Sequence, residues 1–109
     1  MYYIALVTEE EGRYCIDFPS CPGCCTFIEG DGDLQETASE ALEGWLEASI
    51  AASYVISLGY NNYYVEEGIY ELPSKGCSAL IPIAISSDVA AKVVVYKITK
   101  DNLNIAKDF

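Results

Sequence analysis

Five cysteines and no histidine set the metal and redox chemistry that this 109-residue chain can offer. Cys21 and Cys24 have the Cys-x-x-Cys spacing of redox sites and zinc-binding turns, Cys25 follows directly, and Cys77 is a candidate fourth thiolate. A second Cys-x-x-Cys pair is missing, and the proline and glycine between the two cysteines predict a turn rather than the start of a helix. A metal-binding or redox protein is therefore kept as the alternative function, and the sequence predicts no cofactor.

Carboxylates form the second group of residues that could do chemistry. Asp17, Glu29, Asp31 and Asp33 stand close together in the sequence, and a metal-dependent nuclease needs such acids to converge. Two of them, Asp31 and Asp33, lie in a glycine-rich turn that is more simply explained as a helix cap. Without histidine the chain also lacks the commonest general base. The sequence therefore predicts no catalytic residues and a protein that is not an enzyme.

Three strands and a helix are expected to position these groups in the first half of the chain. Apolar and polar residues alternate over 2–8 and 13–18, and a third short strand is expected over 24–29, so that the three form an antiparallel meander. Asp33 and Glu36 have the spacing of a capping box at the start of an amphipathic helix. The pattern leaves open where that helix ends.

The middle of the chain predicts an insertion and a further strand. Residues 59–78 are rich in tyrosine and in turn-forming residues, which either line an interface or cover the end of the protein's own core. Residues 80–85 are apolar and predict a strand. Pro82 lacks a backbone donor, so this strand is expected at an edge of the sheet.

The last part of the chain predicts a second helix. Ser86 or Ser87 is expected to cap it, and it should run to about Lys100. Residues 103–109 resemble the beginning of the next helix of a helix-turn-helix, with nothing following. We therefore expect a domain over residues 1–85, which includes the insertion, and a C-terminal helix and tail over 86–109 with a truncated helix-turn-helix remnant.

A series of motifs in the first 50 residues resembles the HicB family of antitoxins. The matching segments are the stretch from Asp17 to Thr26, then Gly32-Asp33-Leu34, then the helical run from Glu36 to Leu46. Cys21 stands where the family usually has a large apolar residue, and a weaker match covers residues 79–97. The family-motif residues of the turn are Asp17, Pro19, Pro22, Gly23 and Cys24.

The resemblance implies a fold, a function and a partner. The fold is an α+β domain with a three-stranded meander, an amphipathic helix, a further strand and a C-terminal helix, similar to a partial ribonuclease H fold that has lost catalysis. The function is that of an antitoxin of a type II toxin–antitoxin pair. Its partner would be a HicA-like toxin, a small basic protein that cleaves mRNA and carries a catalytic histidine. Because this chain stops where many members continue into a DNA-binding domain, we expect weak or absent sequence-specific DNA binding.

The charge of the chain is strongly acidic and unevenly distributed. The net charge is −11, with −13 over residues 1–72 and +2 over residues 73–109. An acidic surface repels nucleic acid and complements a protein that binds RNA. We therefore expect the first part of the chain to cover the basic surface of the toxin. The predicted contact residues are Glu9, Glu10, Glu11, Arg13, Asp17, Glu29, Asp31 and Asp33.

Two further expectations concern assembly and location. The apolar edge strand, the valine-rich second helix and the tyrosines predict more apolar surface than one small core can bury, so we expect a dimer or a larger homo-oligomer. The sequence has no signal peptide pattern and no apolar run long enough to span a membrane. Together with the odd number of cysteines, this predicts a cytoplasmic protein.

Overall fold

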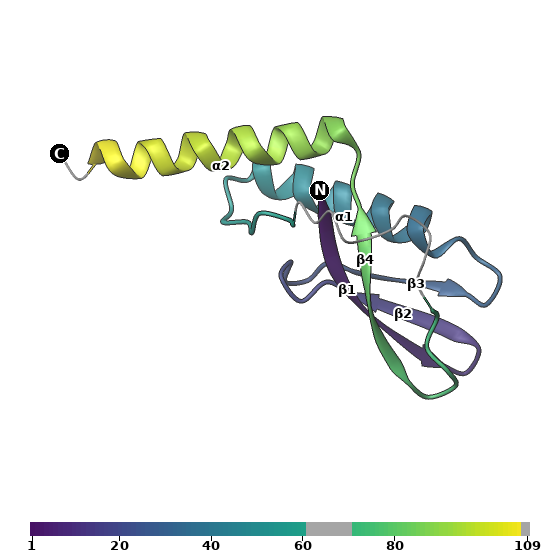
Figure 1. Ribbon diagram of the computed structural model, residues 1–109. Coiled ribbons are helices and arrows are strands. Elements are labelled where there is room, and N and C mark those ends of the chain that lie inside the picture. The colour runs from purple at the N-terminus through teal and green to yellow at the C-terminus, as the bar shows by residue number, and fades with distance from the viewer. Residues whose placement is uncertain (61–70, 108–109) are drawn as a thin grey trace.

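Four antiparallel strands form the sheet on which the chain is built. This computed structural model describes residues 1–60 and 71–107, and the side chains of 1–60 and 71–100. The strands lie in the order β3-β2-β1-β4 (Figure 1). The predicted meander is confirmed, and the strand with Pro82 lies at an edge as expected. The strands are β1 (Tyr2–Glu10), β2 (Arg13–Asp17), β3 (Cys25–Glu29) and β4 (Ser78–Ala84).

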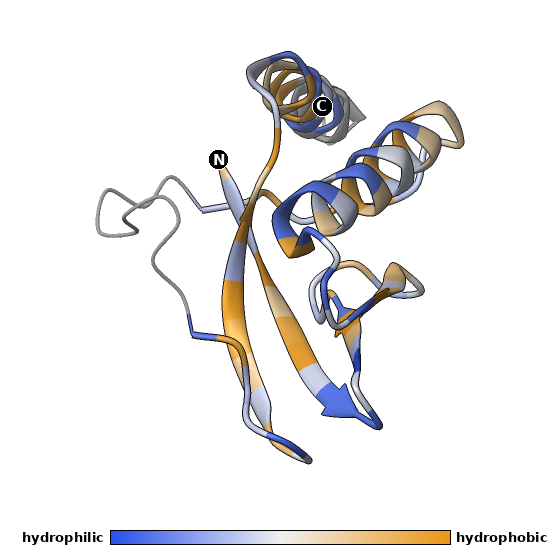
Figure 2. Cartoon of the chain, turned by 90° about the vertical axis from the view of Figure 1, so that its right-hand side faces the viewer, coloured by the Kyte–Doolittle hydropathy of each residue, from blue (hydrophilic) through white to orange (hydrophobic). Residues whose placement is uncertain are grey.

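Helix α1 (Leu34–Ala51) covers one face of the sheet and closes the core (Figure 2). The side chain of Asp33 accepts a hydrogen bond from the backbone N–H of Glu36 at 3.1 Å, which confirms the predicted cap. The helix ends at Ala51, and no helix continues over residues 54–58. The stripe that α1 buries consists of Leu34, Ala38, Leu42, Leu46 and Ser49.

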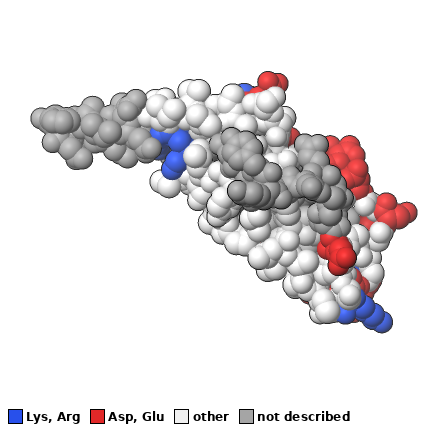
Figure 3. All heavy atoms as spheres, viewed as in Figure 1, with Lys and Arg blue, Asp and Glu red and all other residues white. Residues whose placement is uncertain are grey.

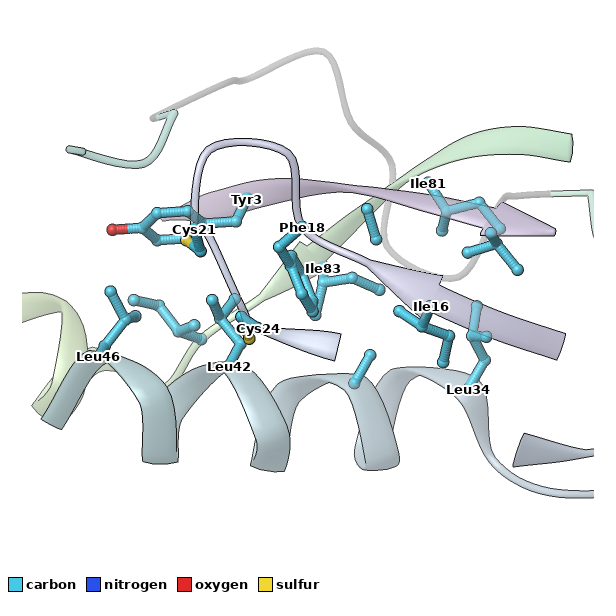
Figure 4. Close-up of a cluster of buried hydrophobic side chains, with 14 of the residues drawn as sticks. Tyr3, Ile16, Phe18, Cys21, Cys24, Leu34, Leu42, Leu46, Ile81 and Ile83 are labelled. Carbon is cyan, nitrogen blue, oxygen red and sulfur yellow. The ribbon is translucent and has the colours of Figure 1, made fainter. Parts of the chain in front are cut away.

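The two faces of the sheet differ because side chains alternate along each strand. The inner face, under α1, carries an apolar set that Figure 4 shows meeting the helix. The outer face is covered by neither helix, since α2 packs on α1. Its apolar side chains remain accessible, with Phe27 52% exposed and Leu80 68% exposed. The buried inner-face residues are Tyr3, Ala5, Val7, Ile16, Ile28, Ile81 and Ile83.

Two hydrogen bonds of Ser86 hold the start of helix α2 (Ser87–Lys107). The Oγ of Ser86 accepts a hydrogen bond from the N–H of Val89 at 3.3 Å, so Ser86 is the capping residue of the two that the sequence offers. The N–H of Ser86 in turn donates to Oε1 of Glu43 at 2.9 Å. A carboxylate from α1 thus sits at the positive end of α2, where the helix dipole favours negative charge.

Helix α2 is one unbroken helix, so two expectations for this segment are wrong. It does not end near Lys100, and residues 103–107 are its last part rather than the start of another helix. The physical reason is that no glycine or proline interrupts the sequence between Ser87 and Lys107. Among the side chains of α2 that the structure describes, up to Lys100, Val93 is the last that is fully buried, and the C-terminal part of the helix extends beyond the sheet (Figure 1).

The middle of α2 holds the chain that follows α1. The hydroxyl of Tyr96 donates to the carbonyl of Tyr54, and Nζ of Lys100 donates to the carbonyl of Ser53 at 2.7 Å. A cation at the C-terminal end of α1 is favourable because the last carbonyls of a helix carry partial negative charge. The two helices are therefore joined by apolar packing and by hydrogen bonds at both ends of their contact.

Much of the tyrosine-rich insertion, residues 61–70, lies outside the described residues. Tyr60, just before it, is exposed and forms an isolated antiparallel bridge with Tyr2, with N–H to carbonyl distances of 2.7 and 2.8 Å. Within the described residues, neither helix has the length and apolar character that a membrane-spanning segment requires.

Candidate partner-binding surface

The β1–β2 hairpin brings several predicted contact residues to one end of the sheet. Glu11 and Gly12 form its two-residue turn, with φ of +54° and +81°, and the strands leave it with Glu10 opposite Arg13. Both turn residues have positive φ, which is the geometry that matches the twist of paired strands. The charged residues that line one surface depression here are Glu9, Glu10, Glu11, Arg13, Glu29 and Lys75. Figure 3 shows acidic side chains along the right-hand side of the molecule, a basic side chain at the lower right tip, and further basic side chains on α2 towards the other end.

Glu9 lies at the same depression but, unlike its neighbours, is nearly buried. Its side chain is only 7% exposed, and its carboxylate accepts hydrogen bonds from the backbone N–H groups of Gly12, at 2.9 Å, and Gly76. These backbone donors hold the pKa of Glu9 below the ordinary glutamate value. Glu9 therefore joins the β1–β2 turn to the loop before β4, which is a structural role that the run of three glutamates does not reveal.

The outward sides of β2 and β3 form a continuous surface, which we call the β2–β3 face. The register places Asp17 opposite Cys25, Cys15 opposite Phe27 and Arg13 opposite Glu29. Arg13, Cys15 and Asp17 of β2 thus have a matching row beside them on β3. The six residues of the β2–β3 face are Arg13, Cys15, Asp17, Cys25, Phe27 and Glu29.

The β2–β3 face is apolar in the middle and charged at both ends. Nη2 of Arg13 lies 3.2 Å from Oε1 of Glu29, and the guanidinium lies 4.6 Å from the centre of the Phe27 ring. Both charged groups are at least half exposed, so this ion pair contributes little to stability. Asp17 lies at the opposite end of β2 from Arg13, about 13 Å away at 3.3 Å per residue. Asp17 and Glu29 therefore do not converge on one point.

The remaining predicted acids lie beside this surface. Asp31 and Asp33 are exposed in the connection from β3 to α1, and Asp33 is occupied as the helix cap.

Two acidic residues of α1 contact α2. Glu43 binds the start of α2, and Oε1 of Glu47 lies 3.9 Å from Nζ of Lys92. The role of Glu43 depends on a helix 43 residues further along the chain, and no local pattern indicates it.

The cysteines proposed as metal ligands are divided between the core and the surface. Cys21 and Cys24 are buried in the core between the sheet and α1 (Figure 4), whereas Cys25 and Cys77 are exposed. Burial raises the pKa of Cys21 and raises that of Cys24 to about 12, which disfavours the thiolate that binds metals. Over residues 1–60 and 71–100, no group of three histidine, cysteine or acidic side chains is arranged to hold a metal ion.

The motif turn docks onto α1 instead. Nε1 of Trp45 donates to the carbonyl of Pro22 at 3.2 Å, and the thiol of Cys24 points to the carbonyl of Ala41 with a sulfur–oxygen distance of 3.8 Å. Gly23 has φ of +84°, which glycine adopts without strain. Pro19 is exposed beside the turn. The turn residues therefore fix the path from β2 to β3 rather than form a reactive site.

Comparisons with known proteins bear on the fold. No protein-family model matches the chain, and no curated protein matches it. Among solved structures, a chain of one described as "HicA3 and HicB3 toxin-antitoxin complex" is similar, with a TM-score of 0.57 and 17% identity. The similarity covers 79% of this chain and 99% of that chain. The α+β fold, with a four-stranded antiparallel sheet and two helices, is thus one found in a toxin–antitoxin complex.

The stability of the hairpin should depend on the charge of Glu9. Because its pKa is lowered in the folded state, its contribution is present above the ordinary glutamate pKa and is lost as the pH falls through the lowered value. We expect Glu9→Gln to lower the free energy of unfolding at neutral pH and to differ less from the wild type in strong acid. Urea unfolding at several pH values measures this. Glu10→Gln, on an exposed side chain, is the control, and an equal loss in both variants would contradict the role of Glu9.

Thiol accessibility should separate the cysteines into two classes. We expect a thiol-specific alkylating reagent to modify Cys25 and Cys77 in the folded protein, and Cys21 and Cys24 only after unfolding, because the latter are buried and keep their protons. Mass spectrometry of peptides identifies the modified sites. The purified protein should contain no stoichiometric zinc. One zinc per chain that is lost with Cys21→Ser would favour the metal-binding alternative.

Proposed function

We propose that this chain is the antitoxin of a toxin–antitoxin pair, a non-catalytic acidic module that neutralises a small basic RNA-cleaving toxin of the HicA type. In this proposal the partial ribonuclease H-like layout serves as a scaffold, and the β2–β3 face with its acidic surroundings covers the active surface of the toxin. The observation that carries the proposal is a sheet face that neither helix covers, with accessible apolar residues at its centre and carboxylates at its ends.

The composition favours the antitoxin over the toxin side of such a pair. The chain has no histidine, whereas the resemblance assigns a catalytic histidine to a HicA-like toxin. Its net charge of −11 is opposite to that of a protein that must hold RNA. An RNA-cleaving role would require a different base and a different surface.

Electrostatics would act mainly on the rate and the specificity of binding. A single exposed carboxylate at an interface rim contributes less than about 1 kcal/mol. A field built from many like charges, however, raises association rates and disfavours wrong partners. Fourteen of the seventeen acidic residues lie within residues 1–72, so the field is strongest around the sheet and α1.

The direct test is rescue of growth. The small basic reading frame beside this gene is cloned and induced alone, then together with this chain. The proposal predicts arrest of growth and cleavage of mRNA by the neighbouring product, and recovery when both are expressed. It is refuted if no such reading frame exists, or if its product remains toxic in the presence of this chain.

Reversing two charges of the β2–β3 face should slow binding. For Asp17→Lys with Glu29→Lys, we expect the association rate with the neighbouring basic protein to fall about tenfold at low salt, and less at high salt, because screening removes the difference. Surface plasmon resonance at several salt concentrations measures the rate. Glu36→Lys with Glu40→Lys, two exposed residues of α1, makes the same change of charge elsewhere. Equal effects of the two double variants would place the contact outside the β2–β3 face.

Self-association belongs to the same proposal and would use α2. Val95 and Ile98 are 63% and 55% exposed, and Ile50, Ala91 and Tyr96 line an apolar groove between α1 and α2 beside them. Packing two copies of α2 about a two-fold axis would bury this surface.

Light scattering should therefore report a dimer or larger species at micromolar concentration. We expect Val95→Asp with Ile98→Asp to convert it to a monomer, because carboxylates cannot be buried in an apolar contact without large cost. Ala48→Asp, on the exposed side of α1, should leave the oligomer intact. A wild-type monomer at all micromolar concentrations would remove self-association from the proposal.

A further inference from the structure

The two edges of the sheet are protected to different degrees. At the β4 edge Pro82 has no N–H to offer, and its carbonyl accepts a hydrogen bond from Nε2 of Gln35 at 3.0 Å. The carbonyl of Ala84 accepts from Oγ of Ser39 at 2.9 Å. Helix α1 therefore occupies backbone acceptors that an added strand would need, which is a common way to close a sheet edge.

At the β3 edge the backbone groups point outward. The N–H of Phe18 donates to the carbonyl of Cys24 at 3.2 Å, which shows that the backbone groups of Phe18 and Cys24 face each other across the ladder. Because hydrogen-bonded and non-hydrogen-bonded pairs alternate in an antiparallel ladder, the N–H and C=O groups of Cys25 and Phe27 face away from β2. Among the described residues, no group outside β3 donates to or accepts from the backbone of these two residues.

The side chains along this edge suit an added strand. Cys25 and Phe27 are exposed, Thr26 is partly buried, and β3 contains neither proline nor lysine, the residues that commonly block an edge. Aromatic and β-branched residues also favour strand pairing. Glu29 is the last residue of β3 on the outer face, and its carboxylate lies beside Arg13.

We infer that β3 accepts an extended segment of the basic partner as a fifth strand of the sheet. This inference rests on the proposed function and adds the mode of recognition. Pairing would give the outward backbone groups of Cys25 and Phe27 two hydrogen bonds each. The segment would carry an apolar side chain beside Phe27 and a lysine or arginine opposite Glu29, because opposite charges across strands are favourable.

Charge selects a basic partner over a second copy of this chain. Antiparallel pairing of two β3 strands about Phe27 would bring Glu29 of each copy next to Cys25 of the other, one strand away from Asp17. It would also bring together two regions that each carry −13 over residues 1–72. A basic segment meets the same carboxylates with attraction, so the edge is better matched to the partner.

Proline substitutions test the edge because they remove one outward N–H without removing a bond of the sheet. We expect Phe27→Pro and Cys25→Pro each to weaken binding of the neighbouring basic protein about tenfold, the effect of losing about 1.4 kcal/mol. Phe27→Val keeps the backbone donor and shortens the side chain, so it sets the baseline for the loss of the ring, and Phe27→Pro should bind more weakly than Phe27→Val. Leu80→Pro makes the matching change at the β4 edge and should leave the affinity unchanged. Circular dichroism verifies that each variant is folded.

Amide hydrogen exchange tests the β3 edge in the wild-type complex, without any substitution. The amides of Cys25 and Phe27 should exchange more slowly in the complex than in the free chain, and that of Leu80 should not. The inference is overturned if exchange at Cys25 and Phe27 is unchanged, or if folded proline variants bind like Phe27→Val. It is also overturned if these variants alter the sedimentation of the chain alone, because the occupant would then be a second copy. Absence of any wild-type binding would instead refute the proposed function.

Discussion

The packing of α1 against one face of the sheet is the interaction on which the other features depend. Leu42 and Leu46 are fully buried between the helix and the inner face, and each such side chain stabilises the fold by about 1.5–3 kcal/mol. The motif turn adds Cys21 and Cys24 to the same core and is fastened to the helix through Trp45. Because α2 packs on α1 rather than on the sheet, neither helix covers the outer face. The surface that we propose for binding is thus a consequence of how the core is closed.

The same packing separates the charges of the molecule. The acidic residues lie mainly around the strands and on the exposed side of α1, whereas the lysines of α2 lie towards the far end (Figure 3). Where the two regions meet, Glu43 binds the start of α2 and Glu47 lies near Lys92. These two carboxylates therefore contact α2 instead of facing solvent alone. The acids around the hairpin and β2 are more exposed, with the exception of Glu9. These are the groups that a basic partner would meet first.

Local patterns in the sequence predicted the order of elements, the alternation along β1 and β2, the Asp33 cap and the edge position of the strand with Pro82. The remainder depended on contacts between distant parts of the chain. Glu9 turns inward because Gly76, far along the chain, supplies a donor to it. The outward row of β3 depends on the register with β2. The full length of α2, by contrast, follows from a local feature, the lack of glycine and proline between Ser87 and Lys107. The resemblance to a known family indicated the fold, but it did not indicate which face of the sheet the helices leave uncovered.

Cys25 is a native reporter on the β2–β3 face, which we propose meets the basic partner. Alkylation of Cys25 can be followed by mass spectrometry in the free chain and in the complex with the neighbouring basic protein, at equal reagent concentration. We expect Cys25, which is exposed in the free chain, to become strongly protected when the complex forms. A complex in which Cys25 reacts as fast as in the free chain would contradict this expectation.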